Sequence, residues 1–161
     1  MTDPEHPRRH PLEARIPPPV VALAVGVAMW AAHRLALGAP APDGRRTLVA
    51  GGLLALALLV VFSAVTTFAR SRTSFDPHHP ESATTLVSSG IFRVSRNPMY
   101  LSMALALLGW AVRLGRPWLG VGPVVFVLYL TRFQIRPEER ALAEKFGPAY
   151  EDYRRSTRRW L

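Results

Sequence analysis

A run without any charged residue, from Leu48 to Ala69, sets the strongest limit on the fold of this chain. Its residues, LVAGGLLALALLVVFSAVTTFA, are numerous and apolar enough to cross a bilayer, because a helix of about 20 residues spans the ~30 Å hydrocarbon core. Inside that core every backbone N–H and C=O group needs a partner within the protein, so such a run folds as an α-helix. We therefore expect an integral membrane protein whose strongest spanning segment is Thr47 to Ala69.

Three further apolar segments accompany this run: Val20 to Leu37, Tyr100 to Val112, and Trp118 to Phe133. Short turns rich in Gly, Pro and Arg (GAPAPDGRR and RLGRP) separate the first segment from the second and the third from the fourth. This order predicts an all-α, polytopic fold with about four hydrophobic helices in two hairpins. The third segment is short for a full crossing, and Pro123 predicts a kink in the fourth.

The net charge of +9 raises the question of nucleic-acid binding. The arginines flank the apolar runs and do not form a stripe on a soluble module, so we expect them to meet the bilayer and not nucleic acid. The chain has no cysteine, which excludes a disulfide, a thiolate nucleophile and a cysteine-based metal site. His78 and His79 have no further ligand at metal-binding spacing, so no metal is expected.

The positions of the basic residues predict the topology. Of the 20 arginines and lysines, 15 fall in the leader of residues 1–19, in the long polar connection after Ala69, and in the chain from Arg132 onward. The other 5 fall on the opposite side of a four-helix arrangement. Because basic residues concentrate on the cytoplasmic side, both termini and the long connection are expected in the cytoplasm. The proline-rich leader is expected to be flexible.

Two clusters of distinctive residues border the second hairpin. The first is LVSSGIFRVSRNPMY, from Leu86 to Tyr100, and the second is RPEERAL, from Arg136 to Leu142. The second cluster opens an amphipathic helical region that extends to Leu161, and its apolar positions recur at helical spacing. Those positions, expected to form a packing face, are Leu142, Phe146, Tyr150 and Tyr153. Because both clusters lie at the same mouth of the hairpin, they can converge.

Together the clusters resemble the isoprenylcysteine carboxyl methyltransferase family and its phospholipid-methyltransferase-like relatives. The resemblance covers about residues 70 to 161 and rests on two motifs in the right order around an apolar hairpin. The matching positions are Leu86, Val87, Gly90, Ile91, Phe92, Arg96, Pro98, Tyr100, Glu138, Glu139, Leu142, Phe146, Gly147, Tyr150 and Tyr153.

The resemblance implies one membrane-embedded domain over residues 1–161, in which residues 84–161 hold S-adenosyl-L-methionine. It implies transfer of a methyl group to a lipophilic small molecule or lipid that enters from the bilayer, with a carboxylate oxygen as one candidate acceptor. The implied cofactor-binding residues are Thr84, Thr85, Leu86, Val87, Phe92, Arg96, Asn97, Pro98, Met99, Tyr100 and Glu138.

Two positions depart from the family pattern. Asn97 stands where eukaryotic members have histidine, and because asparagine does not titrate, a general base is not available there. Gln134 stands where the family uses arginine to hold a substrate carboxylate, four residues before Glu138. Gln134 and the neighbouring Arg136 are the expected substrate-binding residues, and no catalytic residue is assigned.

Adjacent residues on a helix point about 100° apart, so Glu138 and Glu139 are not expected to face the same pocket. Glu138 is expected to bind the cofactor, and Glu139 to face solvent or to pair with Arg136 or Arg140. Two other functions remain open: an NADPH-dependent membrane reductase with a related helical core, and a non-catalytic membrane adaptor. The sequence does not define the oligomeric state.

Overall fold

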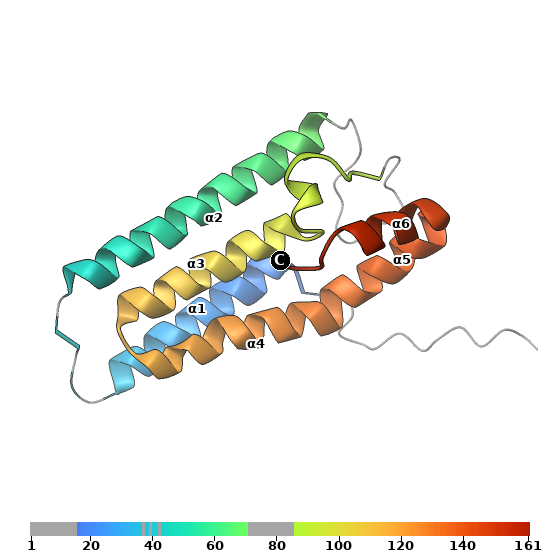
Figure 1. Ribbon diagram of the computed structural model, residues 1–161. Helices are drawn as coiled ribbons and strands as arrows, with labels where there is room; N and C mark the ends of the chain where they lie inside the picture. The colour runs from blue at the N-terminus through green and yellow to red at the C-terminus, as the bar shows by residue number, and fades with distance from the viewer. Residues whose placement is uncertain (1–15, 37, 39, 42, 71–85) are drawn as a thin grey trace, which may run out of the picture.

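The computed structural model describes residues 16–36, 38, 40–41, 43–70 and 86–161, and these residues contain helices and no strand (Figure 1). Most of the predicted leader, and both Thr84 and Thr85, lie outside the described residues. The all-α prediction is confirmed. The elements are α1 (Pro18–Leu35), α2 (Gly44–Arg70), the 3₁₀-helix η2 (Gly90–Arg93), α3 (Pro98–Leu114), the 3₁₀-helix η3 (Pro117–Gly120), α4 (Val121–Leu130), the π-helical turn η4 (Thr131–Ile135), α5 (Arg136–Phe146) and α6 (Pro148–Ser156).

Helix α3 lies at the centre of the bundle. It packs against α1, α2 and α4, and Figure 1 shows α2 on one side of it and α1 and α4 on the other. Helices α1 and α2 run in opposite directions, as a hairpin requires, but α3 lies between them. The predicted first hairpin is therefore not a packed pair. Its short connection reverses the direction of the chain, but it does not determine which helix packs against α2.

The contact between α2 and α3 is made by small side chains. The buried residues of α2 are Ala50, Ala57, Val60 and Ala64. On α3, a β-carbon added to Gly109 would lie 3.2 Å from the carbonyl oxygen of Ala50. Small residues let two membrane helices approach closely, and dispersion contacts between them replace the missing hydrophobic driving force.

Three helical stretches are long and apolar enough to cross a membrane: Pro18–Leu35, Gly44–Arg70 and Pro117–Phe146. Helix α3 has 17 residues and is a shorter apolar helix, as the sequence predicts for the third segment. The outward face of α2 exposes large apolar side chains such as Leu54, Leu58 and Phe62. Such faces suit contact with lipid, and the chain is an integral membrane protein.

The fourth helix is irregular at a place that the sequence does not predict. Gly115 adopts a φ of 71°, the left-handed conformation that ends α3 and turns the chain towards η3. Pro123 lies in the first turn of α4, where its missing N–H removes no helical hydrogen bond. The irregular turn is instead η4, which joins α4 to α5.

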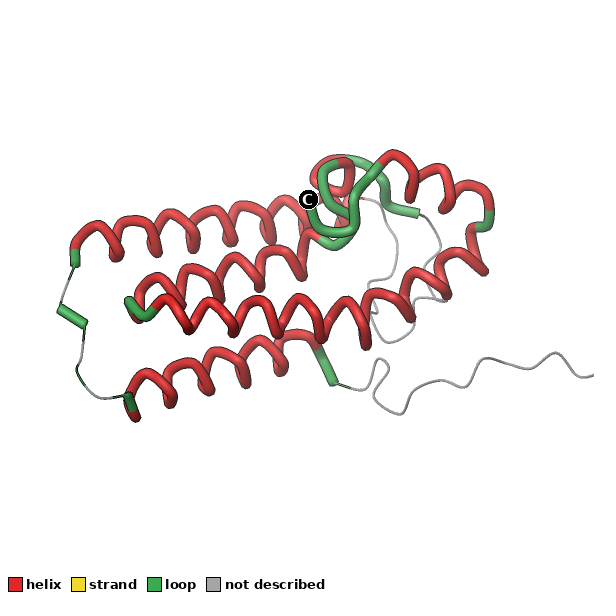
Figure 2. The backbone as a smooth tube through the Cα atoms, turned by 60° about the horizontal axis from the view of Figure 1, so that its bottom comes forward, coloured by secondary structure: helices red, strands yellow, loops and turns green. Residues whose placement is uncertain are grey.

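The amphipathic C-terminal region forms two helices and not one. Gly147 has a φ of 52° and separates α5 from α6, and Pro148 then begins α6. Figure 2 shows that α6 and the residues after it return from the tip of α5 towards one end of the bundle. The beginning of α3, the end of α4 and the C-terminal residues therefore meet at this end.

Candidate functional site

Three side chains from three elements form a polar cluster where α3 begins. The hydroxyl of Tyr100 donates a 2.6 Å hydrogen bond to Oε1 of Glu138, and Nε2 of Gln134 donates another of 2.6 Å to the same oxygen. Pro98 at the first position of α3 places Tyr100 in the first turn of that helix. Gln134 and Glu138 are four residues apart across the junction of η4 and α5, so their side chains lie on one face.

A second cluster surrounds Glu139. Its Oε1 accepts hydrogen bonds from Nη2 of Arg96 at 2.7 Å and from Nε of Arg159 at 2.9 Å. Its Oε2 accepts one from Nη2 of Arg159 at 2.6 Å. The side chains of Glu139 and Arg96 are only 11% and 8% exposed. The prediction that Glu139 faces solvent or pairs with Arg136 or Arg140 is wrong, because α5 turns this face towards the chain before α3 and the C-terminal residues.

Arg96 and Asn97 also fasten the backbone after α6. The guanidinium of Arg96 donates to the carbonyl oxygens of Arg154 and Thr157 at 2.9 and 3.1 Å. The backbone N–H of Arg96 donates to the carbonyl of Arg158 at 2.9 Å. The side-chain amide of Asn97 donates to the carbonyl of Arg159, also at 2.9 Å. Both residues therefore hold the C-terminal segment, residues 157–161, against the chain just before α3.

An aromatic cluster lies beside these polar groups. Phe92 of η2 packs with Val87, Ala64 of α2, and Tyr150 and Tyr153 of α6. The hydroxyl of Tyr153 donates a 2.7 Å hydrogen bond to the carbonyl of Phe92. Leu142 and Phe146 pack against the same cluster, as their helical spacing predicts.

Burial changes the acidity of the tyrosines in this cluster. Burial, with a smaller contribution from the Glu139 carboxylate, raises the pKa of Tyr150 to about 12. Burial likewise raises the pKa of Tyr153. Both side chains are therefore neutral at physiological pH and supply flat, largely apolar surfaces.

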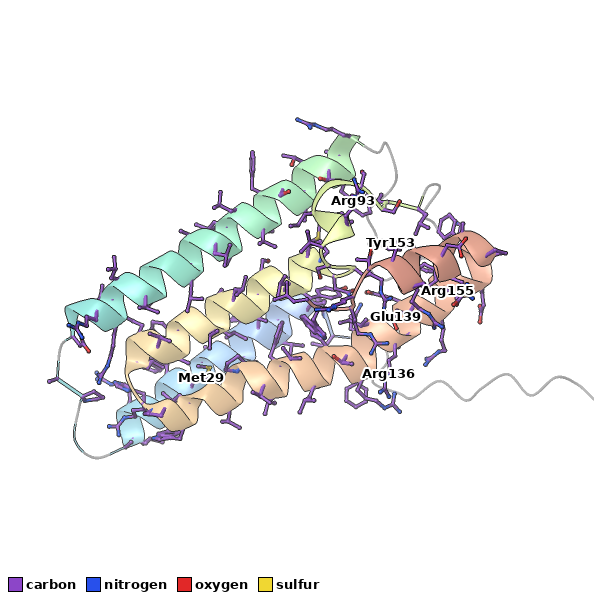
Figure 3. All side chains as sticks on the ribbon, viewed as in Figure 1. Met29, Arg93, Arg136, Glu139, Tyr153 and Arg155 are labelled. Carbon is purple, nitrogen blue, oxygen red and sulfur yellow. The ribbon has the colours of Figure 1, made fainter. Side chains whose placement is uncertain are left out.

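Most of the predicted site residues come together in this region. Leu86 and Val87 belong to the aromatic cluster, and Met99 contacts both that cluster and the main core of the bundle. Pro98 is buried at the start of α3, next to Asn97. Arg136 is the exception, since it is exposed and lies towards the lower edge in Figure 3, whereas Glu139 lies on the inner side of α5.

The sequence interpretation missed Arg159 and the role of the residues around it. Arg159 lies in a basic run after Tyr153, the last position of the motif, and nothing in the spacing distinguishes it from its neighbours. Trp160 is expected from its type to anchor at the membrane interface. In the structure its indole N–H donates to Oγ1 of Thr131 at 3.1 Å. This bond fastens the C-terminal segment to the π-helical turn.

The arrangement supplies the Glu138 anion, the neutral amide of Gln134 and aromatic walls at one end of an apolar bundle, whereas the charge of Glu139 is paired with Arg96 and Arg159. Such a set can bind a ligand with cationic and hydroxyl groups and a flat ring. In the described part of the chain, no group of three or more His, Asp or Glu side chains could hold a metal ion.

Fold and site together define an α-helical integral membrane protein whose two polar clusters gather at one end of the bundle. The chain belongs to the phospholipid methyltransferase family, whose sequence pattern matches residues 45–149. The match runs from the start of α2 into α6 and includes both clusters except Arg159. The expected relationship to this family and to the isoprenylcysteine carboxyl methyltransferases is confirmed.

Individual relatives match parts of the chain. A probable protein-S-isoprenylcysteine O-methyltransferase of Oryza sativa subsp. indica is 36% identical over 93 residues, which are 56% of this chain and 47% of the rice protein. The corresponding protein of subsp. japonica matches equally. The aligned part is therefore about half the length of these relatives.

An uncharacterized protein of Haemophilus influenzae is 44% identical over 63 residues, which are 39% of this chain and 100% of that protein. No solved structure matches the chain. The family and the rice relatives indicate a membrane methyltransferase.

Proposed function

We propose that this chain transfers a methyl group from S-adenosyl-L-methionine to a lipophilic acceptor that reaches the site from the bilayer. The observation that carries the proposal is the Glu138 carboxylate, which Tyr100 and Gln134 hold at the end of the bundle beside the aromatic cluster. The family supports the reaction class, and the geometry supports the position of the site.

The residues present fit the donor molecule in chemical type. Its ammonium group and ribose hydroxyls call for an anionic acceptor, and Glu138 provides one in a fixed orientation. Its adenine calls for a flat apolar surface, which the buried rings of Phe92 and Tyr100 can supply. Its sulfonium is a cation that an aromatic face stabilises.

When bound, the donor supplies an electrophilic methyl carbon. The chain's own residues would orient the two substrates and exclude water, because no titrating general base stands at Asn97. The amide of Asn97 instead donates to the carbonyl of Arg159. The C-terminal segment is thereby held where it can cover the site on the aqueous side.

The residue at position 134 bears on the acceptor. Gln134 is only 2% exposed and donates to Glu138, so this position carries no cation for a substrate carboxylate. Arg136, the other predicted substrate residue, lies on the outer face of α5. We therefore assign the acceptor only to the class of lipophilic molecules and keep O-methylation and N-methylation as outcomes of the assay.

Titration calorimetry of the purified protein in detergent tests the donor. We expect S-adenosylmethionine and S-adenosylhomocysteine to bind and NADPH not to bind. A folded sample that binds neither adenosyl ligand would overturn the proposal, and binding of NADPH alone would support a reductase. Incubation with a membrane lipid extract and labelled donor, followed by identification of the labelled product, then defines the acceptor.

A further inference from the structure

Two adjoining cavities lie along α1 and α3, and the second of them is at the other end of the bundle from the candidate site. The first is an open groove of about 460 Å³ between α1 and α3, with an almost wholly apolar lining. The second is a pocket of about 300 Å³ near the end of α1, the start of α2 and the end of α3 (left in Figure 1). Trp30 and Trp110 line both cavities, so the groove continues into the pocket.

The pocket is basic. Arg34, Arg46 and Arg113 line it together with His33, and Asp43 is the acidic residue of its lining. Asp43 lies 3.4 Å from Arg46 and offsets the charge of that arginine. The pocket therefore keeps the positive charges of Arg34 and Arg113, which suit an anionic group.

Two further features concern the walls of this pocket. The guanidinium carbon of Arg34 lies 5.8 Å from the centre of the Trp30 ring, so the indole orients one of the two charges. The Nδ1 atom of His33 is buried and has no hydrogen-bond partner among the described residues. A ligand oxygen in the pocket would be a natural partner for this imidazole.

The groove matches the depth of one lipid leaflet. On α1 its lining runs from Ala22 to Trp30, a rise of about 12 Å at ~1.5 Å per residue. This approaches half of the ~30 Å hydrocarbon core. Gly26 lines the groove without a side chain, and its carbonyl accepts a 3.2 Å hydrogen bond from the indole N–H of Trp110. A chain lying there would end with its polar group beside Arg34 and Arg113.

We propose that this combined cavity binds an anionic phospholipid. Its phosphate would lie between Arg34 and Arg113, and one acyl chain would lie in the groove between α1 and α3. The basic pocket that would hold the phosphate lies at the opposite end of the bundle from the polar clusters around Glu138 and Glu139. A lipid bound here would hold α1 against α3.

Lipid retention by the intact protein tests this proposal. The protein is placed in nanodiscs of phosphatidylcholine with a minor fraction of phosphatidylglycerol, and the lipid that remains after transfer to detergent is counted by native mass spectrometry. We expect selective retention of phosphatidylglycerol. Arg34→Gln and Arg113→Gln should each reduce it about tenfold, because each removes a charge-assisted hydrogen bond.

Matched controls separate a built site from general attraction. Arg45→Gln removes an exposed arginine at the same end that does not line the pocket, and it should leave retention unchanged. Gly26→Leu fills the groove and should reduce retention, whereas Ala24→Leu, on the exposed face of the same helix, should not. Circular dichroism and thermal melting confirm that each variant is folded.

Three results would overturn the proposal. An equal loss with Arg45→Gln would mean that surface charge alone attracts the lipid. Unchanged retention in Gly26→Leu would mean that no chain occupies the groove. Displacement of the lipid by inorganic phosphate would show an anion site without a place for the acyl chain. None of these outcomes depends on methyl transfer, so failure here leaves the proposed function untouched.

Discussion

Glu138 and Glu139 are consecutive residues of α5, yet their carboxylates belong to separate hydrogen-bond clusters. Glu138 accepts from Tyr100 and Gln134, and Glu139 accepts from Arg96 and Arg159. The angle of about 100° between neighbouring helical residues separates them. One carboxylate therefore faces the proposed ligand, and the other joins three segments of the protein.

Replacing Glu138 should weaken binding of the methyl donor without unfolding the protein. Glu138→Gln removes an anion that we expect to bind the donor through a charge-assisted hydrogen bond, a loss of roughly 1.5–3 kcal/mol. This corresponds to an increase in Kd of about tenfold or more, measurable by titration calorimetry. Tyr100→Phe should have a smaller effect in the same direction, since it frees the carboxylate to rotate. A Glu138→Gln variant with wild-type affinity would remove this residue from the site.

Replacing Glu139 should instead destabilise the fold. Glu139→Ala leaves the buried guanidinium of Arg96 without its anion, and loss of one partner from a buried ion pair costs about 3 kcal/mol or more. We expect a cost at the lower end of this range, because the second partner of Glu139, Arg159, is 35% exposed. Thermal unfolding in detergent measures this cost. Asp152→Ala is the control, because its pair with Arg155 is almost fully exposed and should contribute little. Equal melting temperatures for the two variants would contradict the buried cluster.

The buried tyrosines predict how the C-terminal helices respond to alkali. Tyr150 has a folded-state pKa of about 12, raised from 10.0. A raised pKa in the folded state gives stability that is complete below about pH 10 and is lost as the pH rises towards 12. Tyrosinate absorbance should therefore show late-titrating groups, with one fewer in Tyr150→Phe, in which Tyr153 still titrates late. In denaturant all tyrosines should ionise near pH 10. A native titration identical to the denatured one would show that the ring is not buried.

The absence of natural cysteines allows a direct test of topology. Ser88 lies at the end of the bundle that carries the site, and Gly44 at the other end, and both are exposed. The distribution of arginine and lysine predicts that Ser88 is cytoplasmic and Gly44 is not. A membrane-impermeant maleimide applied to intact cells should therefore label Gly44→Cys and spare Ser88→Cys until the cells are opened. The reverse pattern would mean that the bundle is inserted the other way.

The elements of the fold follow well from the sequence, because each depends on local composition. The charge-free run predicts α2, and the spacing of Leu142, Phe146, Tyr150 and Tyr153 predicts the packed face of the C-terminal helices. The position of α3 between α1 and α2 was not predicted, because it depends on which small side chains permit close contact. Ala50 and Gly109 provide that contact, but their types alone do not pair them.

The site follows from the sequence only in part. The motifs correctly predict that residues 96–100 lie close to Glu138. The contacts of Glu138 lie within segments that match the family. The role of Glu139 was wrong because its partner Arg159 is one of several similar arginines, and only the return of the chain after α6 selects it. Whether these residues bind the donor remains a prediction.

The π-helical turn at Thr131–Ile135 has a consequence for the evolution of this site. A π-turn carries one more residue than the α-helical path it replaces, so deleting a single residue there would let the helix run on as a regular α-helix. The helix after the turn would keep its orientation, because the widened turn absorbs the extra residue. In a regular α-helix the same extra residue would rotate every later side chain by about 100°. That rotation equals the angle between Glu138 and Glu139, so it would place one carboxylate where the other now lies. The turn therefore keeps each carboxylate with its own partners although the helix before it carries an additional residue.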